Sequence, residues 1–267
     1  MDYTRYKELI IEKQGSVAVV TFNRPQLLNA VTMELHTELE HLWVDLAHDE
    51  EINAIVLTGA GRAFSAGGNI KKMLERYRTD EGWKQLTTTG FRSKNLLRNM
   101  LEVPQPIVSA VNGDAMGVGA TLALCSDISV MAETARIGDT HVKVGLVAGD
   151  GGAVIWPMLI GAAKAKECLL LGRVLNGIEA AQMGLVNHAV PVEQVLPKAM
   201  ELARELASLP PLAVRWTKQA ANMHIKAQFN LVFDAGAAHE MLTFHSEDHG
   251  EAARAFVEKR KGSFKGR

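Results

Sequence analysis

Hydrophobic and polar positions in the first 60 residues follow the two-residue period of strands and then the spacing of a helix. The runs at 8–15 and 16–23 are rich in β-branched residues and meet at a glutamine-glycine pair, so they predict a hairpin. Apolar residues between 32 and 49 recur mostly three or four positions apart, which predicts an amphipathic helix. The apolar run at 53–59 predicts a buried strand. The chain therefore opens with a ββα unit followed by another strand.

A similar order of elements recurs as far as residue 172. The pattern predicts helices near 83–101, from about 117 and within 151–172, and strands at 106–113 and 127–133. From about 193 to 260 no strand pattern remains, and the spacing of Leu, Ala, Met and Phe predicts several consecutive helices. We expect an α/β fold with a core over residues 1–192 and a helical region over 193–267. Partner subunits are one means of covering the apolar face of those helices.

Composition and charge narrow the classes of function. With 267 residues, 47% of them hydrophobic and 22% charged, the chain can bury a large core. A net charge of -1 without single-sign blocks argues against nucleic-acid binding and against a polybasic membrane patch. Cys125 and Cys168 form no C-x-x-C motif, and no apolar run approaches the ~20 residues of a membrane span. With no export signal in the N-terminal residues, we expect a cytoplasmic protein.

Three glycine-rich segments carry the chemical signal, at 63–72, 112–121 and 138–152. In each of them small residues precede a helical pattern, and the N–H groups at the start of a helix lack partners within it. Two such donors from separate loops could form an oxyanion hole, although tight turns alone could also account for the glycines. A dinucleotide-binding fingerprint is not supported, because the segment GVGATL lacks the third glycine.

Taken together, the segments resemble those of the crotonase superfamily, that is, the enoyl-CoA hydratase/isomerase family. The resemblance extends over nearly the whole chain, and the order and spacing of its motifs make it specific. It rests on FNRP, AFSAGGNIKKM, PIVSAVNG and AFVEKRKGSF, in that order. It implies a crotonase-like spiral of ββα units with a C-terminal helical trimerisation region. It also implies a homotrimer or homohexamer and an acyl-CoA substrate, with no metal or further cofactor.

The resemblance also assigns functional positions. The backbone N–H groups of Ala66 and Val118 match the family's two oxyanion-hole donors, which bind the thioester oxygen of an acyl-CoA as it becomes an enolate. Other matched positions would bind the substrate: Arg24 (a phosphate partner), Leu28, Phe64, Gly67, Ile70, Gly117, Thr121, and Phe256 and Lys259 (contacts to CoA, often across a subunit boundary).

Two catalytic positions depart from the family pattern. Hydratases of the family use two glutamates, and the aligned residues here are Thr121 and His141. A threonine hydroxyl can position a water but cannot serve as its base, whereas histidine, with an ordinary pKa of about 6.5, can do so. Asp150 stands where other branches carry a catalytic carboxylate. We therefore expect His141 to be the base and Asp150 to orient its ring.

Other activities of the superfamily stay open. The branch that hydrolyses β-diketones, of which 6-oxocamphor hydrolase is an example, resembles this chain in a histidine and an aspartate nine residues apart. Glu240 is the candidate for a further acid of that branch. A C–C bond hydrolase is therefore one alternative. A non-catalytic member that binds CoA or RNA is another, although the near-neutral charge argues against RNA.

Several of these residues also have purely structural explanations. Asp150 could cap a helix that starts at Gly151, and backbone groups could satisfy His141. Asp139 and Asp114 fit turn positions. The segments 245–249 (HSEDH) and 71–78 could be solvated helix faces, although the cations of the latter could also shield CoA phosphates. Trp83, Leu86 and Phe91 could line an acyl pocket or belong to the core.

Overall fold

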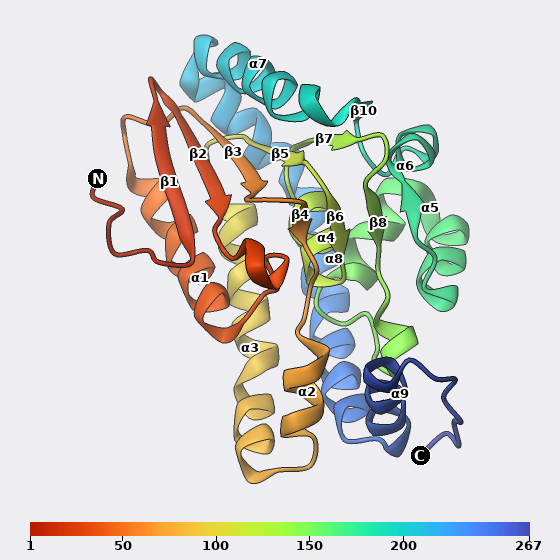
Figure 1. Ribbon diagram of the computed structural model, residues 1–267. Helices are drawn as coiled ribbons and strands as arrows, with labels where there is room; N and C mark the ends of the chain where they lie inside the picture. Colours follow the sequence, from red (N-terminus) through yellow and green to blue (C-terminus); the bar gives the residue numbers. More distant parts are fainter.

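The computed structural model describes residues 1–267 and contains two β-sheets with helices around them (Figure 1). The large sheet has six strands in the order β1-β2-β3-β5-β7-β10. β1 and β2 form the expected hairpin, and the other neighbours are parallel. The strands are β1 (Leu9–Gln14), β2 (Val17–Phe22), β3 (Ala54–Gly59), β5 (Ile107–Val111), β7 (Ile128–Ala132) and β10 (His188–Val190).

The small sheet has four strands in the order β4-β6-β8-β9. These strands are β4 (Ala63–Ser65), β6 (Asp114–Met116), β8 (Arg136–Gly138) and β9 (Leu175–Asn176). β4, β6 and β8 run parallel, and β9 pairs antiparallel with β8. None of the four was predicted from the hydrophobic pattern, because two or three residues are too few to show an alternation.

The two sheets are built in alternation along the chain. β3, β5 and β7 of the large sheet are each followed by one strand of the small sheet, β4, β6 and β8, and then by a helical segment. This repeated order confirms the α/β fold with a crotonase-like spiral of ββα units. Because β4, β6 and β8 are parallel, their carboxyl ends lie at the same edge of the small sheet. The glycine-rich segments that follow these strands therefore meet in space.

Helices surround the sheets. They are α1 (Met33–His48), α2 (Ile70–Arg76), α3 (Asp80–Glu102), α4 (Val118–Leu124), α5 (Gly152–Leu171), α6 (Gly177–Met183), α7 (Val195–Ser208), α8 (Pro211–Phe244) and α9 (Glu247–Glu258), with 3-10 turns η1 (Pro25–Leu27), η2 (His141–Val144) and η3 (Val192–Gln194). α7 packs on the large sheet, the long α8 runs beside α3 and α5, and α9 lies against α2 (Figure 1). Only helical elements follow β10, as expected. None of these helices combines the length and the apolar content that crossing a bilayer requires.

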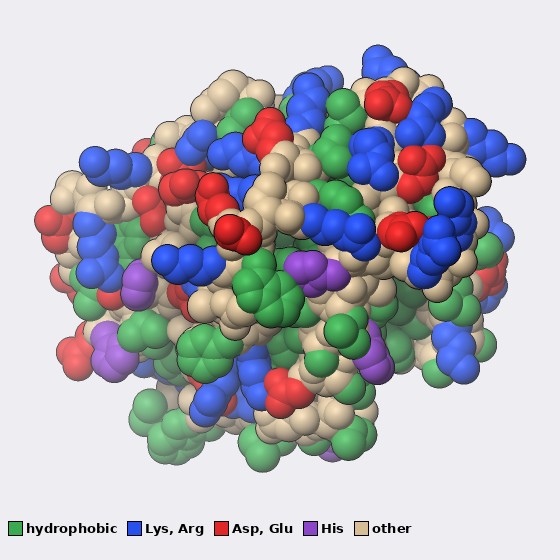
Figure 2. Space-filling model, turned by 90° about the horizontal axis from the view of Figure 1, so that it is seen from below, with side chains coloured by type: hydrophobic (Ala, Val, Ile, Leu, Met, Phe, Trp, Pro, Cys, Tyr) green, Lys and Arg blue, Asp and Glu red, His purple; other side chains and the backbone are tan.

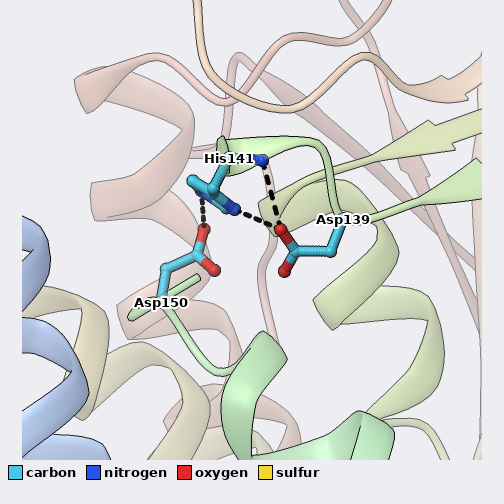
Figure 3. A group of neighbouring side chains, drawn as sticks. All are labelled: Asp139, His141 and Asp150. Carbon is cyan, nitrogen blue, oxygen red and sulfur yellow. Dashed lines mark hydrogen bonds and ion pairs between the residues drawn. The ribbon is translucent and has the colours of Figure 1, made fainter. Parts of the chain in front are cut away.

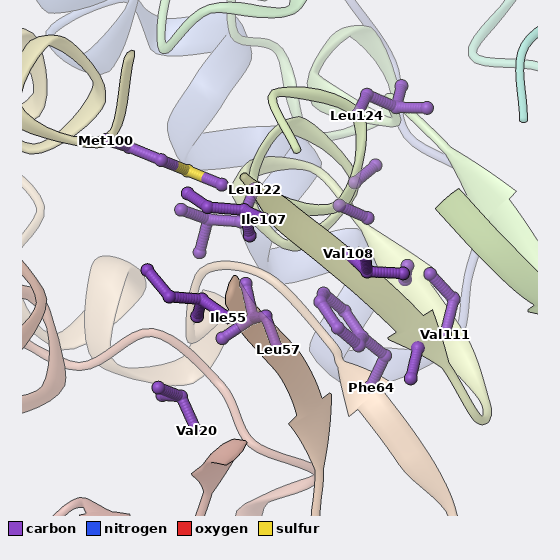
Figure 4. Packing of buried hydrophobic residues seen from close by; sticks show 14 of the residues in the cluster. Val20, Ile55, Leu57, Phe64, Met100, Ile107, Val108, Val111, Leu122 and Leu124 are labelled. Atoms are coloured by element: carbon purple, nitrogen blue, oxygen red, sulfur yellow. The ribbon is translucent and has the colours of Figure 1, made fainter. Parts of the chain in front are cut away.

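The core lies between the sheets and the helices (Figure 4). Ile55 and Leu57 of β3, and Val108 and Val111 of β5, are fully buried. Phe64 of β4 is also fully buried, and its ring contacts that of Phe22 edge to face, with 5.2 Å between centroids. The assignment of Phe64 to the CoA channel is therefore wrong, because its side chain points into the core.

The surface seen from below carries no large field of one sign (Figure 2). Lys, Arg, Asp and Glu side chains are interspersed over the upper part of that face, and hydrophobic side chains gather along its lower edge. This distribution agrees with the net charge of -1.

Candidate active site

One pocket collects residues from all three glycine-rich segments. Gly68 comes from the segment after β4, Val118 from the segment after β6, and His141 and Asp150 from the segment after β8. Residues from α1, α2, α3 and the end of α8, among them Glu240, complete the wall. The parallel small sheet thus brings together residues that are far apart in the sequence.

Asp139 holds the ring of His141 from behind the pocket (Figure 3). Its Oδ1 lies 2.6 Å from His141 Nδ1 and also accepts the His141 backbone N–H at 3.3 Å. The second contact is the turn that the sequence predicts for Asp139, but the first makes this residue more than a turn residue. Asp139 is 2% exposed, so the ion pair is shielded from water. Asp139 is therefore placed to orient the ring, the role that we expected of Asp150, which contacts the other ring nitrogen.

Asp150 and Glu240 face the other nitrogen of the same ring. Asp150 Oδ2 lies 3.3 Å from His141 Nε2, and Glu240 Oε1 lies 3.9 Å from it. The second oxygen of Asp150, Oδ1, is buried without a hydrogen-bond partner. Asp150 is not a helix cap, since α5 begins after Gly151 and no side chain caps it. A histidine satisfied by the backbone is also excluded, because carboxylates contact both ring nitrogens.

The neighbouring charges set the protonation states. Burial opposes the charged form of His141, but the carboxylates of Asp150 and Asp139 outweigh it and hold the pKa of His141 well above 6.5. Burial, followed by the charge of Asp150, raises the pKa of Glu240 from 4.5 to about 8. Both shifts favour the protonated form of the group at neutral pH. The expectation that His141 is the base stays a prediction, and the raised pKa favours another role, since a protonated imidazole donates a proton rather than accepting one.

The cluster is poorly suited to a metal ion. One ligand atom from each of Asp139, His141 and Asp150 lies within 4.8 Å of the others. The two carboxylates, however, contact opposite nitrogens of the ring (Figure 3). An ion bound to one nitrogen would face only one of them, and the imidazolium already offsets part of their charge.

Two backbone N–H groups point to an anion site. Val118 is the first residue of α4, and Gly68 precedes α2 by two residues. Both residues line the pocket, and neither N–H group donates a hydrogen bond within the chain. The N–H of Ala66 instead donates to the Leu28 carbonyl at 2.9 Å, and Ala66 does not line the pocket. Gly67, at φ +76°, has its α-carbon so near the Met116 carbonyl that a Cβ there would lie 2.3 Å from the oxygen. Only glycine fits this approach.

Thr121 is turned away from the pocket. It is fully buried in α4, and its hydroxyl donates weakly to the Gly117 carbonyl at 3.4 Å. Gly117 itself donates its N–H to Gly138 at 3.0 Å, which ties the second segment to the third. A Cβ on Gly117 would lie 3.4 Å from His141 Cε1, so the glycine leaves room for the ring. The expectation that Thr121 positions a water is not supported by this geometry.

The residues matched to CoA binding lie outside the pocket. Arg24 forms an ion pair with Glu8. Leu28 has a left-handed backbone (φ 52°), and Ile70 is the first residue of α2. Phe256 is 60% exposed, and Lys259 ends α9. Their contacts to CoA stay predictions, whereas Lys72, Arg76 and Arg78 of the segment 71–78 do line the pocket.

The remaining candidates are divided between the pocket, the core and the surface. His249 is 1% exposed, and its Nδ1 bonds the Val144 carbonyl at 2.7 Å, so the segment 245–249 is not a solvated face. Leu86 lines the pocket, whereas Trp83 does not and contacts the pocket residue His245 edge to face, with 4.8 Å between ring centroids. Phe91 is 69% exposed and belongs neither to the core nor to the pocket.

Comparison with known proteins settles the family. The sequence profile described as enoyl-CoA hydratase/isomerase matches residues 12–267. The chain belongs to the enoyl-CoA hydratase/isomerase family. It is thus an enzyme of the hydratase/isomerase type, as the sequence motifs predicted.

Relatives of this family member cover almost its full length. It is 36% identical over 256 residues to a short-chain-enoyl-CoA hydratase of Clostridium acetobutylicum, with 95% of each chain covered. It is 32% identical over 260 residues to a crotonyl-CoA hydratase of Syntrophomonas wolfei, covering 97% of this chain and 98% of the relative. A solved enoyl-CoA hydratase/isomerase from Mycobacterium paratuberculosis superimposes with a TM-score of 0.87 at 36% identity, covering 92% of this chain and 97% of that one.

Proposed function

We propose that this enzyme converts an acyl-CoA thioester through an enolate, and that the N–H groups of Gly68 and Val118 bind the thioester oxygen. The observation that carries the proposal is the convergence of these two free donors with His141, Asp150 and Glu240 on one pocket. Gly68 takes the place first expected of Ala66, whose N–H is already bonded. Losing one oxyanion-hole donor typically costs about 10²- to 10³-fold in rate.

The protonation states assign each proton transfer to one side chain. Asp150 is the proposed base, because it lines the pocket beside His141 and a carboxylate can accept a proton from the substrate. The electron pair of the broken C–H bond moves onto the thioester oxygen, where the two N–H groups stabilise it. Glu240, protonated at neutral pH, returns a proton to another carbon, and His141 holds both acids in place. This sequence of steps describes the migration of a double bond.

A set of three variants tests the assignment. Asp150→Asn and His141→Ala should each lower kcat/KM by about 10²- to 10⁴-fold, and the double variant should lose little more, since members of one catalytic unit are non-additive. A panel of enoyl-CoA and β-ketoacyl-CoA thioesters supplies the substrate. Asp114→Asn is the control, because Asp114 pairs with Arg136 on the surface. Full activity of Asp150→Asn would overturn the proposal.

A second candidate is hydrolysis of a C–C bond in a β-diketone. Glu240, the further acid expected in that branch, lies 3.9 Å from His141 Nε2. In this reaction water adds to one carbonyl, the bond to the shared carbon breaks, and that carbon takes a proton. Formation of a carboxylic acid from a cyclic β-diketone without CoA would favour this candidate. Thioester binding without turnover of any panel member would favour a non-catalytic role.

A further inference from the structure

A second group of polar side chains lines the active-site pocket and has no part in the chemistry proposed above. It consists of His36 from α1 and of Gln85, Thr89 and Ser93 from α3. The three α3 residues follow one another at intervals of four, so they lie along one face of the helix. They are half-buried, whereas their neighbours on the other face are exposed. α3 thus turns a polar strip toward the pocket.

The hydrogen-bonding state of His36 follows from its surroundings. The residue is 8% exposed, and its Nδ1 is buried 3.6 Å from Glu40 Oε2. Glu40 Oε2 forms an ion pair with Arg92 Nη2 at 3.1 Å, and a carboxylate can only accept hydrogen bonds. At 3.6 Å Glu40 makes no hydrogen bond with Nδ1, but its negative charge favours the tautomer that carries the hydrogen on Nδ1. Burial, followed by the charge of Arg92, lowers the pKa of His36 to about 4, so the ring is neutral at pH 7.

This state leaves Nε2 as an acceptor without a partner. No hydrogen bond within the chain involves His36 Nε2 or Ser93 Oγ, and neither atom is sealed from the pocket. The two residues lie on facing turns, because Arg92, next to Ser93, bonds Thr37, next to His36. The pocket thus contains one acceptor and one hydroxyl that only a ligand or water can satisfy.

The chemistry of these atoms selects among acyl groups. A hydroxyl can donate to His36 Nε2 and accept from Ser93 Oγ. A carbonyl cannot donate, and an alkyl chain would leave a desolvated acceptor unpaired, which is unfavourable. A carboxylate, like a carbonyl, has no hydrogen to donate to Nε2.

We propose that the acyl group of the substrate carries a hydroxyl on a carbon away from those that react, and that His36 Nε2 accepts the hydrogen bond of that hydroxyl. The inference rests on the proposed function for the thioester itself. His36 determines specificity and takes no part in the proton transfers.

Binding of unreactive thioesters tests the inference independently of catalysis. Saturated acyl-CoAs of four to eight carbons are compared by calorimetry with their ω-hydroxy counterparts. At one or more chain lengths the hydroxy thioester should bind about 10-fold more tightly, the effect of one buried hydrogen bond. His36→Leu should abolish this preference, whereas His36→Gln, which restores an acceptor, should keep most of it. His41→Leu on the exposed side of α1 is the matched control.

Equal binding of both members of every pair by the wild-type protein would overturn the inference. The same conclusion follows if His36→Leu keeps the preference. Thioester binding without turnover of any unsaturated substrate counts against the proposed function alone. Failure to bind any thioester would overturn both.

Discussion

Nδ1 of His141 lies 2.6 Å from Oδ1 of Asp139, and a single residue separates the two in the chain. The contact needs no distant element, because η2 begins at His141 and turns its ring back over the preceding residues. Asp150 and Glu240 then occupy the opposite side of the ring. Asp139 thereby fixes the imidazole on one side, and Asp150 and Glu240 lie beside its other nitrogen at the pocket.

Replacing Asp139 should impair catalysis without unfolding the protein. Asp139→Asn keeps the shape of the side chain but removes the charge that raises the pKa of His141. We expect that pKa to fall and kcat/KM to drop by about 10²- to 10⁴-fold through loss of the charged, oriented ring. Proton NMR titration and steady-state kinetics measure the two effects. The surface variant Asp114→Asn should show neither effect, and an unchanged His141 pKa in Asp139→Asn would contradict the assignment.

The carboxyl of Glu240 should make stability depend on pH. Its pKa is raised from 4.5 to about 8, so between these values the folded state holds a proton that the unfolded state has lost. This residue therefore lowers the free energy of unfolding as the pH rises through that window. Glu240→Gln should gain stability over the wild type from pH 5 to pH 8, on the order of a few kcal/mol. Denaturant unfolding at several pH values measures the difference, and a pH-independent difference would speak against the raised pKa.

Hydration of crotonyl-CoA should be slow. Neither Thr121 nor His141 replaces the glutamates that handle water in hydratases, and the Thr121 hydroxyl is turned toward Gly117. We expect a rate about 10²- to 10⁴-fold below that of a glutamate-containing relative, assayed beside it under the same conditions. Comparable rates would show that Asp150 and Glu240 can together activate water.

The long helix α8 should mediate self-association. Trp216, Met223, Leu231 and Leu242 are 62–74% exposed and follow one another after 7, 8 and 11 residues, that is, after about two, two and three turns, so they lie on one side of the helix. They form an apolar stripe that a second chain could cover. We expect a trimer or hexamer by size exclusion with light scattering, and a shift toward smaller species in Leu231→Lys with Leu242→Lys. A wild-type monomer at micromolar concentration would refute this.

The sequence was informative where residues repeat a pattern over many positions. The hairpin, the long helices and the first five strands of the large sheet were predicted, because five or more residues carry a recognisable hydrophobic pattern. The sixth strand, β10, has three residues and was not predicted. The small sheet was missed because its strands are two or three residues long, although they place the active site. Phe64 was misassigned for the same reason, since the direction of a side chain in a three-residue strand depends on the partner strand.

The candidate site was predicted in part. The motif placed His141 and Asp150 in one segment, and the structure brings them together. The sequence predicts a turn residue at Asp139, because aspartate is common in turns and nothing local shows that it is buried. The protonation of His141 could not be predicted either, since it depends on two carboxylates whose positions follow from packing.

Gly145, which ends η2, lies so close to the start of α9 that a Cβ there would sit 2.8 Å from the His249 α-carbon. Together with the bond between His249 and Val144, this contact locks the segment that carries His141 onto the C-terminal helix. The two segments should therefore open as one cooperative unit in hydrogen exchange. They should also diverge together in evolution: relatives that lose the glycine should have displaced this helix, and the catalytic ring with it.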